Sequence, residues 1–240
     1  NKALEIKTEG LVLKRIKYSD SKVILHVFTP DLGRVASIIT IGKSKTSKYK
    51  RHISVPLQFV KLVLVKPNKG ELYRIKEIKH ALIYKNLMQD LRRSAIGIYL
   101  LEFLDKSLKE SSKQPELYWF FLSSITHLDI AESIENIHLH TVTNMTRFFG
   151  IYPNIKNGSA PFFDMQMGQL TQGVSKSTIS EGMTNYLKQF LDKELQDSGN
   201  ITMSRHQRIE YLENLEAYWS YHCEPFTRTK SLKVLQEVIP

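Results

Sequence analysis

The chain has 240 residues, of which 42% are hydrophobic and 24% charged, a composition that excludes an extensively disordered protein. Its 34 Lys and Arg against 24 Asp and Glu give a net charge of +10, which favours a polyanionic partner such as nucleic acid or an anionic membrane surface. No apolar run approaches the ~20 residues of a membrane span, and the single cysteine, Cys223, excludes a disulfide within the chain and a multi-cysteine zinc site.

Segments rich in β-branched residues fill the first third of the chain. Strands are predicted at 4–17, 23–28, 35–41, 57–65 and 72–78, separated by turns. Gly10 interrupts the first strand, as a bulge or a barrel bend would. Strands this numerous in a segment this short favour a small closed barrel over a flat sheet with exposed edges. The pattern leaves open whether the barrel is an OB-fold or another small barrel.

A strongly basic segment follows the third predicted strand. Residues 42–51 hold five cations, one tyrosine and no acid, so the segment cannot be buried and is predicted to be a projecting loop. Residues 1–80 carry 18 Lys and Arg against 6 Asp and Glu, whereas the remaining 160 residues carry 16 against 18. The excess positive charge therefore belongs to the predicted barrel.

From about Asn86 the apolar residues recur at helical spacing. Helices are predicted at 91–108 and 117–128, the second with Pro115 in its first turn, and from Ile134 to a stop at Gly150. Residues 151–174 are predicted to be irregular, and helices resume at 176–195, at 204–222 and after Ser231, a candidate N-cap. The predicted domains are a barrel, 1–84, and a helical domain, 85–240, with the irregular excursion inside it.

Several short motifs follow one another along the chain. They are Gly10-Leu-Val-Leu-Lys14, Tyr18-Ser-Asp-Ser-Lys22, Phe28-Thr29, Gly33-Arg34, Gly42-Lys43, Pro56-Leu-Gln-Phe59, Leu72-Tyr-Arg74, Phe148-Phe-Gly-Ile-Tyr-Pro153, Tyr218, His222 and Lys230-Ser-Leu232. This ordered set resembles the RecO family of bacterial recombination mediators. The resemblance implies an α+β multidomain fold, in which an N-terminal five-stranded OB-fold barrel precedes an all-helical C-terminal domain.

The resemblance also implies a function without catalysis. Such a protein binds single- and double-stranded DNA, anneals strands and helps to load recombinase onto strands coated by single-strand-binding protein. Its implied partners are RecR and the C-terminal tail of that coating protein. Many relatives carry a four-cysteine zinc site in the excursion, but residues 154–174 contain neither Cys nor His here. We therefore expect no zinc and no cofactor, and an apolar plug of Phe162, Phe163 and Met165 in place of the metal.

Candidate binding residues are chosen by their charge and by the aromatic residues among them. Cations that neutralise phosphates and aromatics that stack on bases are what a single-strand groove requires. The predicted DNA-binding residues are Lys14, Arg15, Lys17, Tyr18, Arg34, Lys43, Lys45, Lys48, Lys50, Arg51 and Arg74. In the helical domain, the cations available to rim an aromatic groove for an acidic protein tail are Arg92, Arg93, Arg205 and Arg208.

Other functions are weighed on the same residues. Gly42-Lys43-Ser44 resembles the end of a phosphate-binding loop, but Ser37 stands where that motif needs its first glycine, which argues against nucleotide binding. No acid pair, catalytic triad or metal motif stands out. Two alternatives stay open: an RNA-binding or ribosome-associated OB-fold protein, and a phosphodiester-acting enzyme with a basic recruiting barrel. With no signal-peptide pattern in the sequence, we expect a cytoplasmic, nucleoid-associated protein without membrane attachment.

Overall fold

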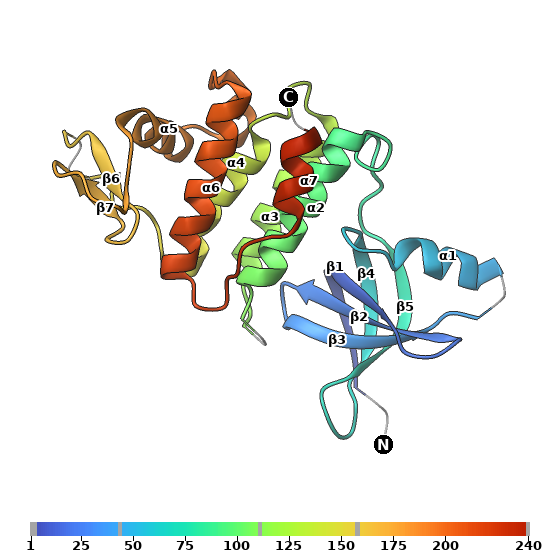
Figure 1. Ribbon diagram of the computed structural model, residues 1–240. Helices are drawn as coiled ribbons and strands as arrows, with labels where there is room; N and C mark the ends of the chain where they lie inside the picture. Colours follow the sequence, from blue (N-terminus) through green and yellow to red (C-terminus); the bar gives the residue numbers. More distant parts are fainter. Residues whose placement is uncertain (1–3, 43–44, 110–111, 157–158, 239–240) are drawn as a thin grey trace. The chain divides into compact units, whose positions relative to one another are not determined.

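The structure is a computed structural model that describes residues 4–42, 45–109, 112–156 and 159–238. It divides into two compact units, one made of Asn1–Tyr84 with Leu108–Leu122 and the other of Lys85–Ser107 with Ser123–Pro240. Figure 1 shows the first unit as a barrel of blue to teal strands and the second as helices coloured green to red. Among the described residues, no helix is long and apolar enough to cross a membrane.

Five strands close into the N-terminal barrel, which confirms the predicted fold. They are β1 (Glu5–Lys17), β2 (Lys22–Thr29), β3 (Gly33–Thr40), β4 (Phe59–Val65) and β5 (Tyr73–His80). Their order is β1-β2-β3-β5-β4, and pairing of β4 with β1 closes the barrel. The parallel β3–β5 contact completes an OB-fold. Aliphatic side chains fill the interior, among them Val12, Leu25, Val27, Ile39, Leu62 and Ile75.

Strand β1 changes partner in its middle. Its residues up to Leu11 pair with β4, and those from Leu11 onward pair with β2. Gly10 lies at this barrel bend, but the expected alternative of a bulge at Gly10 is wrong, because the register shift falls between Val12 and Lys14. Gly10 is needed for close packing instead. A Cβ atom at this position would lie 2.3 Å from Cγ1 of Val27.

Gly10→Ala is expected to lower the free energy of unfolding by about 1–3 kcal/mol, the usual penalty of overpacking a core. Urea unfolding followed by circular dichroism measures the change. Gly182→Ala serves as the control, since the new Cβ meets nothing closer than 4.0 Å in helix α5 (Glu181–Asp192). That substitution should leave stability unchanged or raise it by about 0.5–1 kcal/mol. Equal effects of the two substitutions would contradict the packing role of Gly10.

The basic segment is a helix, so its prediction as a loop is wrong. Helix α1 spans Lys45–Ile53 and ends with Lys50, Arg51 and His52, cations that complement the negative end of the helix dipole. Ile53 is fully buried and joins the barrel interior, which anchors the helix. The expectation that cations of this segment stay in solvent is correct for Lys48 and Arg51, which are exposed.

The second unit is helical, as predicted. It contains α2 (Leu91–Ser107), α4 (Ile137–Met145), α5, α6 (Arg205–His222), α7 (Ser231–Val238) and the short 3-10 helices η1 (Thr146–Phe149) and η2 (Leu195–Asn200). Helix α3 (Pro115–Ile130) contributes its first half to the barrel unit and its second half to the helical unit. Trp219 is fully buried, with its ring 5.0 Å from that of Phe103 and 4.9 Å from that of Phe149. Gly150, at φ 69°, ends η1 as expected.

The excursion is more ordered than predicted. A small antiparallel sheet of β6 (Phe162–Asp164), β7 (Gln169–Thr171) and β8 (Thr178–Ile179) forms there, coloured yellow in Figure 1. The next helix therefore begins at Glu181, with Ser180 as its N-cap, rather than near 176. The Asp164 carboxylate accepts hydrogen bonds from the backbone N–H groups of Gln166 and Met167 and from the Ser177 hydroxyl, all at 2.9 Å. These contacts hold the turn of the sheet, which residue periodicity does not reveal.

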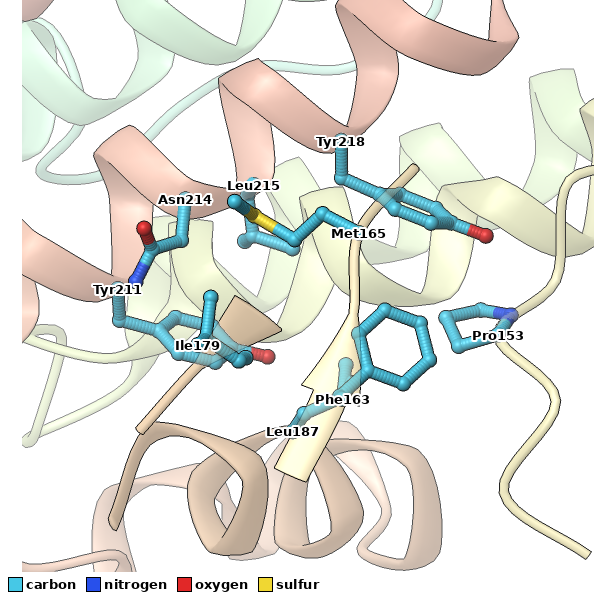
Figure 2. Close-up of a pocket in the computed structure, with 9 residues that line it drawn as sticks. All are labelled: Pro153, Phe163, Met165, Ile179, Leu187, Tyr211, Asn214, Leu215 and Tyr218. Carbon is cyan, nitrogen blue, oxygen red and sulfur yellow. The ribbon is translucent and has the colours of Figure 1, made fainter. Parts of the chain in front are cut away.

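Apolar side chains fasten the excursion to α5 and α6. Phe163 is 2% exposed, and its ring lies 5.7 Å from that of Tyr218. Figure 2 shows Phe163 and Met165 among the nine residues around a cavity of about 20 Å³. Phe162 lies outside this set and is half-buried. Because residues 154–174 supply no Cys or His ligand, a four-cysteine zinc site cannot form there.

Two carboxylates fix the segments that lead into α7 and α2. Glu102 accepts hydrogen bonds from the N–H groups of Lys230 and Ser231 and from the Ser231 hydroxyl. Ser231 is therefore the first residue of α7 and a donor to Glu102, not the expected N-cap. Asp129, 4% exposed, accepts from the N–H groups of Lys85 and Asn86 at 2.8 Å and of Leu87 at 2.7 Å.

Candidate nucleic-acid interface

The outer face of β1, β2 and β3 is set by strand register. Side chains that are directly opposite each other in a sheet point to the same side. Leu25 and Val27 of β2 point into the barrel, so His26 between them points outward. Its register partners are Lys14 on β1 and Ala36 on β3. The three strands therefore present one continuous outer surface.

A groove of about 320 Å³ lies on this surface. Strands β2 and β3 contribute His26, Arg34 and Ala36, and the start of β5 contributes Tyr73. The connection between β4 and β5 supplies Lys66, Pro67, Gly70 and Glu71, and the segment before α3 supplies Lys113. Arg34, Lys66 and Lys113 are three cations around one concave site, with Tyr73 beside them. Such a site can neutralise phosphates, whereas Tyr73 is partly buried and packs against the barrel core.

Acidic residues are distributed so as to leave this groove positive. Of the six acids in residues 1–80, only Glu71 lines it. On the outer face of β1, β4 and β5, by contrast, Lys76 lies 2.6 Å from Glu5, Lys61 3.9 Å from Glu9 and Lys79 3.8 Å from Glu77. A larger groove of about 650 Å³ on that face mixes both signs of charge. These two grooves thus differ in charge, the smaller being cationic and the larger balanced.

The predicted DNA-binding residues on the strands do not form one cluster. Arg34 lines the cationic groove. Lys14 lies opposite His26 on the outer face, and Arg74 is paired with Ile38 of β3. Lys17 and Tyr18 lie at the β1–β2 turn, where Tyr18 is 62% exposed and Lys17 is 3.2 Å from Asp20. Arg15 is opposite Leu25, which is an interior residue, so it points away from the outer face.

The predicted residues on α1 form a separate basic surface. Lys48 and Arg51 are exposed and Lys50 is half-exposed, Lys45 is the first residue of α1, and Lys43 lies outside the described residues. The Tyr49 ring of α1 is 5.7 Å from the ring of His80, which is the last residue of β5. Tyr73, which lines the groove, is the first residue of the same strand. At ~3.3 Å per residue the two ends of β5 are about 23 Å apart. Of the cations whose side chains the structure describes on α1, Lys48, Lys50 and Arg51 therefore do not line the groove.

The four candidate cations of the helical unit have different surroundings. Arg92 is exposed on the first turn of α2. The Arg93 guanidinium donates to the carbonyls of Leu128 and Ala131, at the end of α3. Arg205 donates to the Gln236 carbonyl and Arg208 to Asn136, and burial lowers the pKa of Arg208. Arg205 and Arg208 share a cavity of about 10 Å³, which has room for one water molecule and not for a peptide.

Comparison with known proteins places the whole chain. Residues 4–84 match the family model "Recombination protein O N terminal", and residues 88–233 match "Recombination protein O C terminal". The chain belongs to the RecO family. It is 33% identical to the DNA repair protein RecO of Flavobacterium psychrophilum over 236 residues, 98% of this chain and 99% of the relative. It is 30% identical to RecO of Flavobacterium johnsoniae (98% and 99%) and of Bacteroides fragilis (97% and 98%).

The sequence of this RecO-family chain gives little indication that several of the groove residues belong to the site. Lys66 directly precedes the predicted Pro67–Gly70 turn, so it could have been chosen as a basic turn residue. His26 lies within a β-branched run, and only its outward direction gives it a place in the site. Lys113 lies outside the segment that matches the RecO N-terminal model, and nothing in the sequence connects it to the barrel.

Proposed function

We propose that this protein acts in recombinational DNA repair as a mediator without enzymatic activity. In this proposal it binds single- and double-stranded DNA, anneals strands and helps to load recombinase onto strands coated by single-strand-binding protein. The relatives named DNA repair protein RecO support the repair role. RecR and the tail of single-strand-binding protein are the proposed protein partners, with the helical unit as the proposed site for the tail.

The cationic groove is the observation that carries the proposal. Arg34, Lys66 and Lys113 line one concave surface on the outer face of an OB-fold, with a single acid among them. Strands 2 and 3 and the loop between strands 4 and 5 are where OB-folds bind oligonucleotides. A phosphate backbone that follows the groove would replace condensed counterions with these three cations.

Binding to a labelled single strand is expected to weaken as salt rises, with a log–log slope of at least about −2. The expected slope is about −0.7 for each of the three groove cations. Fluorescence anisotropy of an oligothymidine over a series of salt concentrations measures it, and unlabelled duplex DNA and RNA serve as competitors. A slope near zero would contradict the proposal. Stronger competition by RNA than by DNA would favour the RNA-binding alternative, and strand cleavage with Mg²⁺ would favour the enzyme.

A further inference from the structure

The segment that leads into α3 lies against the barrel at Gly33. This glycine begins β3 with φ +69°, and a Cβ atom added to it would lie 2.5 Å from the carbonyl oxygen of Ser112 and 2.8 Å from its carbonyl carbon. A contact this close is possible only for a residue without a side chain. The backbone at Ser112 is therefore held directly against the start of the strand that carries Arg34.

The same segment is held on its other side by the first half of α3. Tyr118 is 1% exposed, and its ring lies 5.8 Å from that of Phe28 and 5.9 Å from that of Phe59, both edge-on. Leu117 is fully buried. Lys113 follows Ser112 and precedes these anchors, so the backbone position of Lys113 is fixed from both directions. Its side chain is exposed and lines the groove with Arg34 and Lys66.

We propose that Lys113 is a nucleic-acid-binding residue, through which the residues directly before α3 form one wall of the groove. The inference rests on the proposed function of that groove. A bound strand would then contact the barrel and, at the same time, a residue that belongs to the part of the chain matched by the C-terminal family model. Because binding energies are linked, the strand would also strengthen the docking of this segment on the barrel.

Salt-dependent binding of the full-length protein to labelled oligothymidine tests this role. Lys113→Ala is expected to reduce the steepness of the log–log slope by about 0.7 and to weaken binding about fivefold near 0.1 M salt. Lys113→Arg should restore both values, because it keeps the charge. Lys109→Ala is the matched control, since Lys109 is an exposed lysine of the same segment that does not line the groove. It should leave slope and affinity unchanged.

The outcomes separate this inference from the function on which it rests. If Lys113→Ala keeps the wild-type slope while Arg34→Ala flattens it, the segment is not part of the site and the groove keeps its proposed function. If Lys109→Ala acts as strongly as Lys113→Ala, the effect is one of net charge and the inference is also wrong. If the wild-type protein does not bind strands, both proposals fail. Thermal unfolding of each variant shows whether the fold is intact.

Discussion

Replacing both Arg34 and Lys66 by alanine is expected to weaken single-strand binding about 25-fold near 0.1 M salt and to flatten the salt slope by about 1.4. Each phosphate contact contributes about 0.7 to the slope, which is about fivefold in Kd at that salt concentration. Both cations line the groove on the outer face of the OB-fold. Anisotropy titrations at several salt concentrations measure both quantities.

A pair of lysines on the outer face of β4 and β5 provides the control. Lys61→Ala with Lys79→Ala removes the same net charge from the face where these residues lie near Glu9 and Glu77. Its effect on binding should stay within about twofold at physiological salt, where exposed charges are screened beyond about 8 Å. Glu71→Gln should act in the opposite direction and strengthen binding, since Glu71 is the acid that lines the groove. If the Lys61/Lys79 double variant lost as much affinity as the Arg34/Lys66 double variant, binding would depend on net charge and not on the groove.

Asp129→Ala is expected to lower the free energy of unfolding by about 3 kcal/mol or more. The substitution leaves the N–H groups of Lys85, Asn86 and Leu87 without their acceptor. Each buried donor left unsatisfied costs about 1–3 kcal/mol, and two of these three are only partly buried. Asp90→Ala is the comparison, because Asp90 accepts from the N–H groups of Arg92 and Arg93 at the start of α2. Loss of that N-cap should cost about 1 kcal/mol.

The effect of Asp129 should also depend on pH. Burial by itself raises the pKa of this carboxyl, but the three N–H donors and Arg93 outweigh it and hold the pKa below the usual value. A lowered pKa in the folded state means that the stabilisation is complete above the unfolded pKa, about 3.9, and is lost as the pH falls through the folded value. Urea unfolding from pH 7 to pH 3 should therefore show wild type and variant converging below about pH 4. A constant difference over that range would contradict the assignment.

Sequence periodicity predicted the barrel and the long helices because their buried residues recur at regular spacing along the chain. Alternation around Leu25 and Val27, and the helical spacing of Tyr99 and Phe103, are consequences of burial that residue types reveal. The helix at Lys45–Ile53 and the small sheet are different. Burial of Ile53 anchors the first, and hydrogen bonds to Asp164 and the packing of Phe163 hold the second. Neither set of contacts repeats along the chain, so neither produces a periodic pattern of residue types.

The groove was only partly accessible to sequence reasoning for the same physical reason. Tyr73 lies in a predicted strand and Arg34 directly before one, and the charge imbalance indicated the barrel as a whole. Lys113 enters the groove through the contact of Ser112 with Gly33, a tertiary contact between residues far apart in the chain. Lys48, Lys50 and Arg51 of the basic segment, by contrast, lie on α1 at the other end of β5. Charge density alone therefore indicated the barrel unit correctly. Within that unit it indicated a part other than the groove.

The division of α3 between the two units has a consequence for synthesis on the ribosome. Phe28 and Phe59 lie on the outside of the barrel and are covered by Tyr118, so the barrel unit is complete only with residues 108–122. At about 5–20 residues per second, translation needs roughly 2–8 s to pass from the end of the barrel sequence to this helix. During that interval the newly made strands keep two aromatic side chains in water. We therefore expect chaperones to bind the nascent barrel during that interval and the docking of α3 to end the exposure.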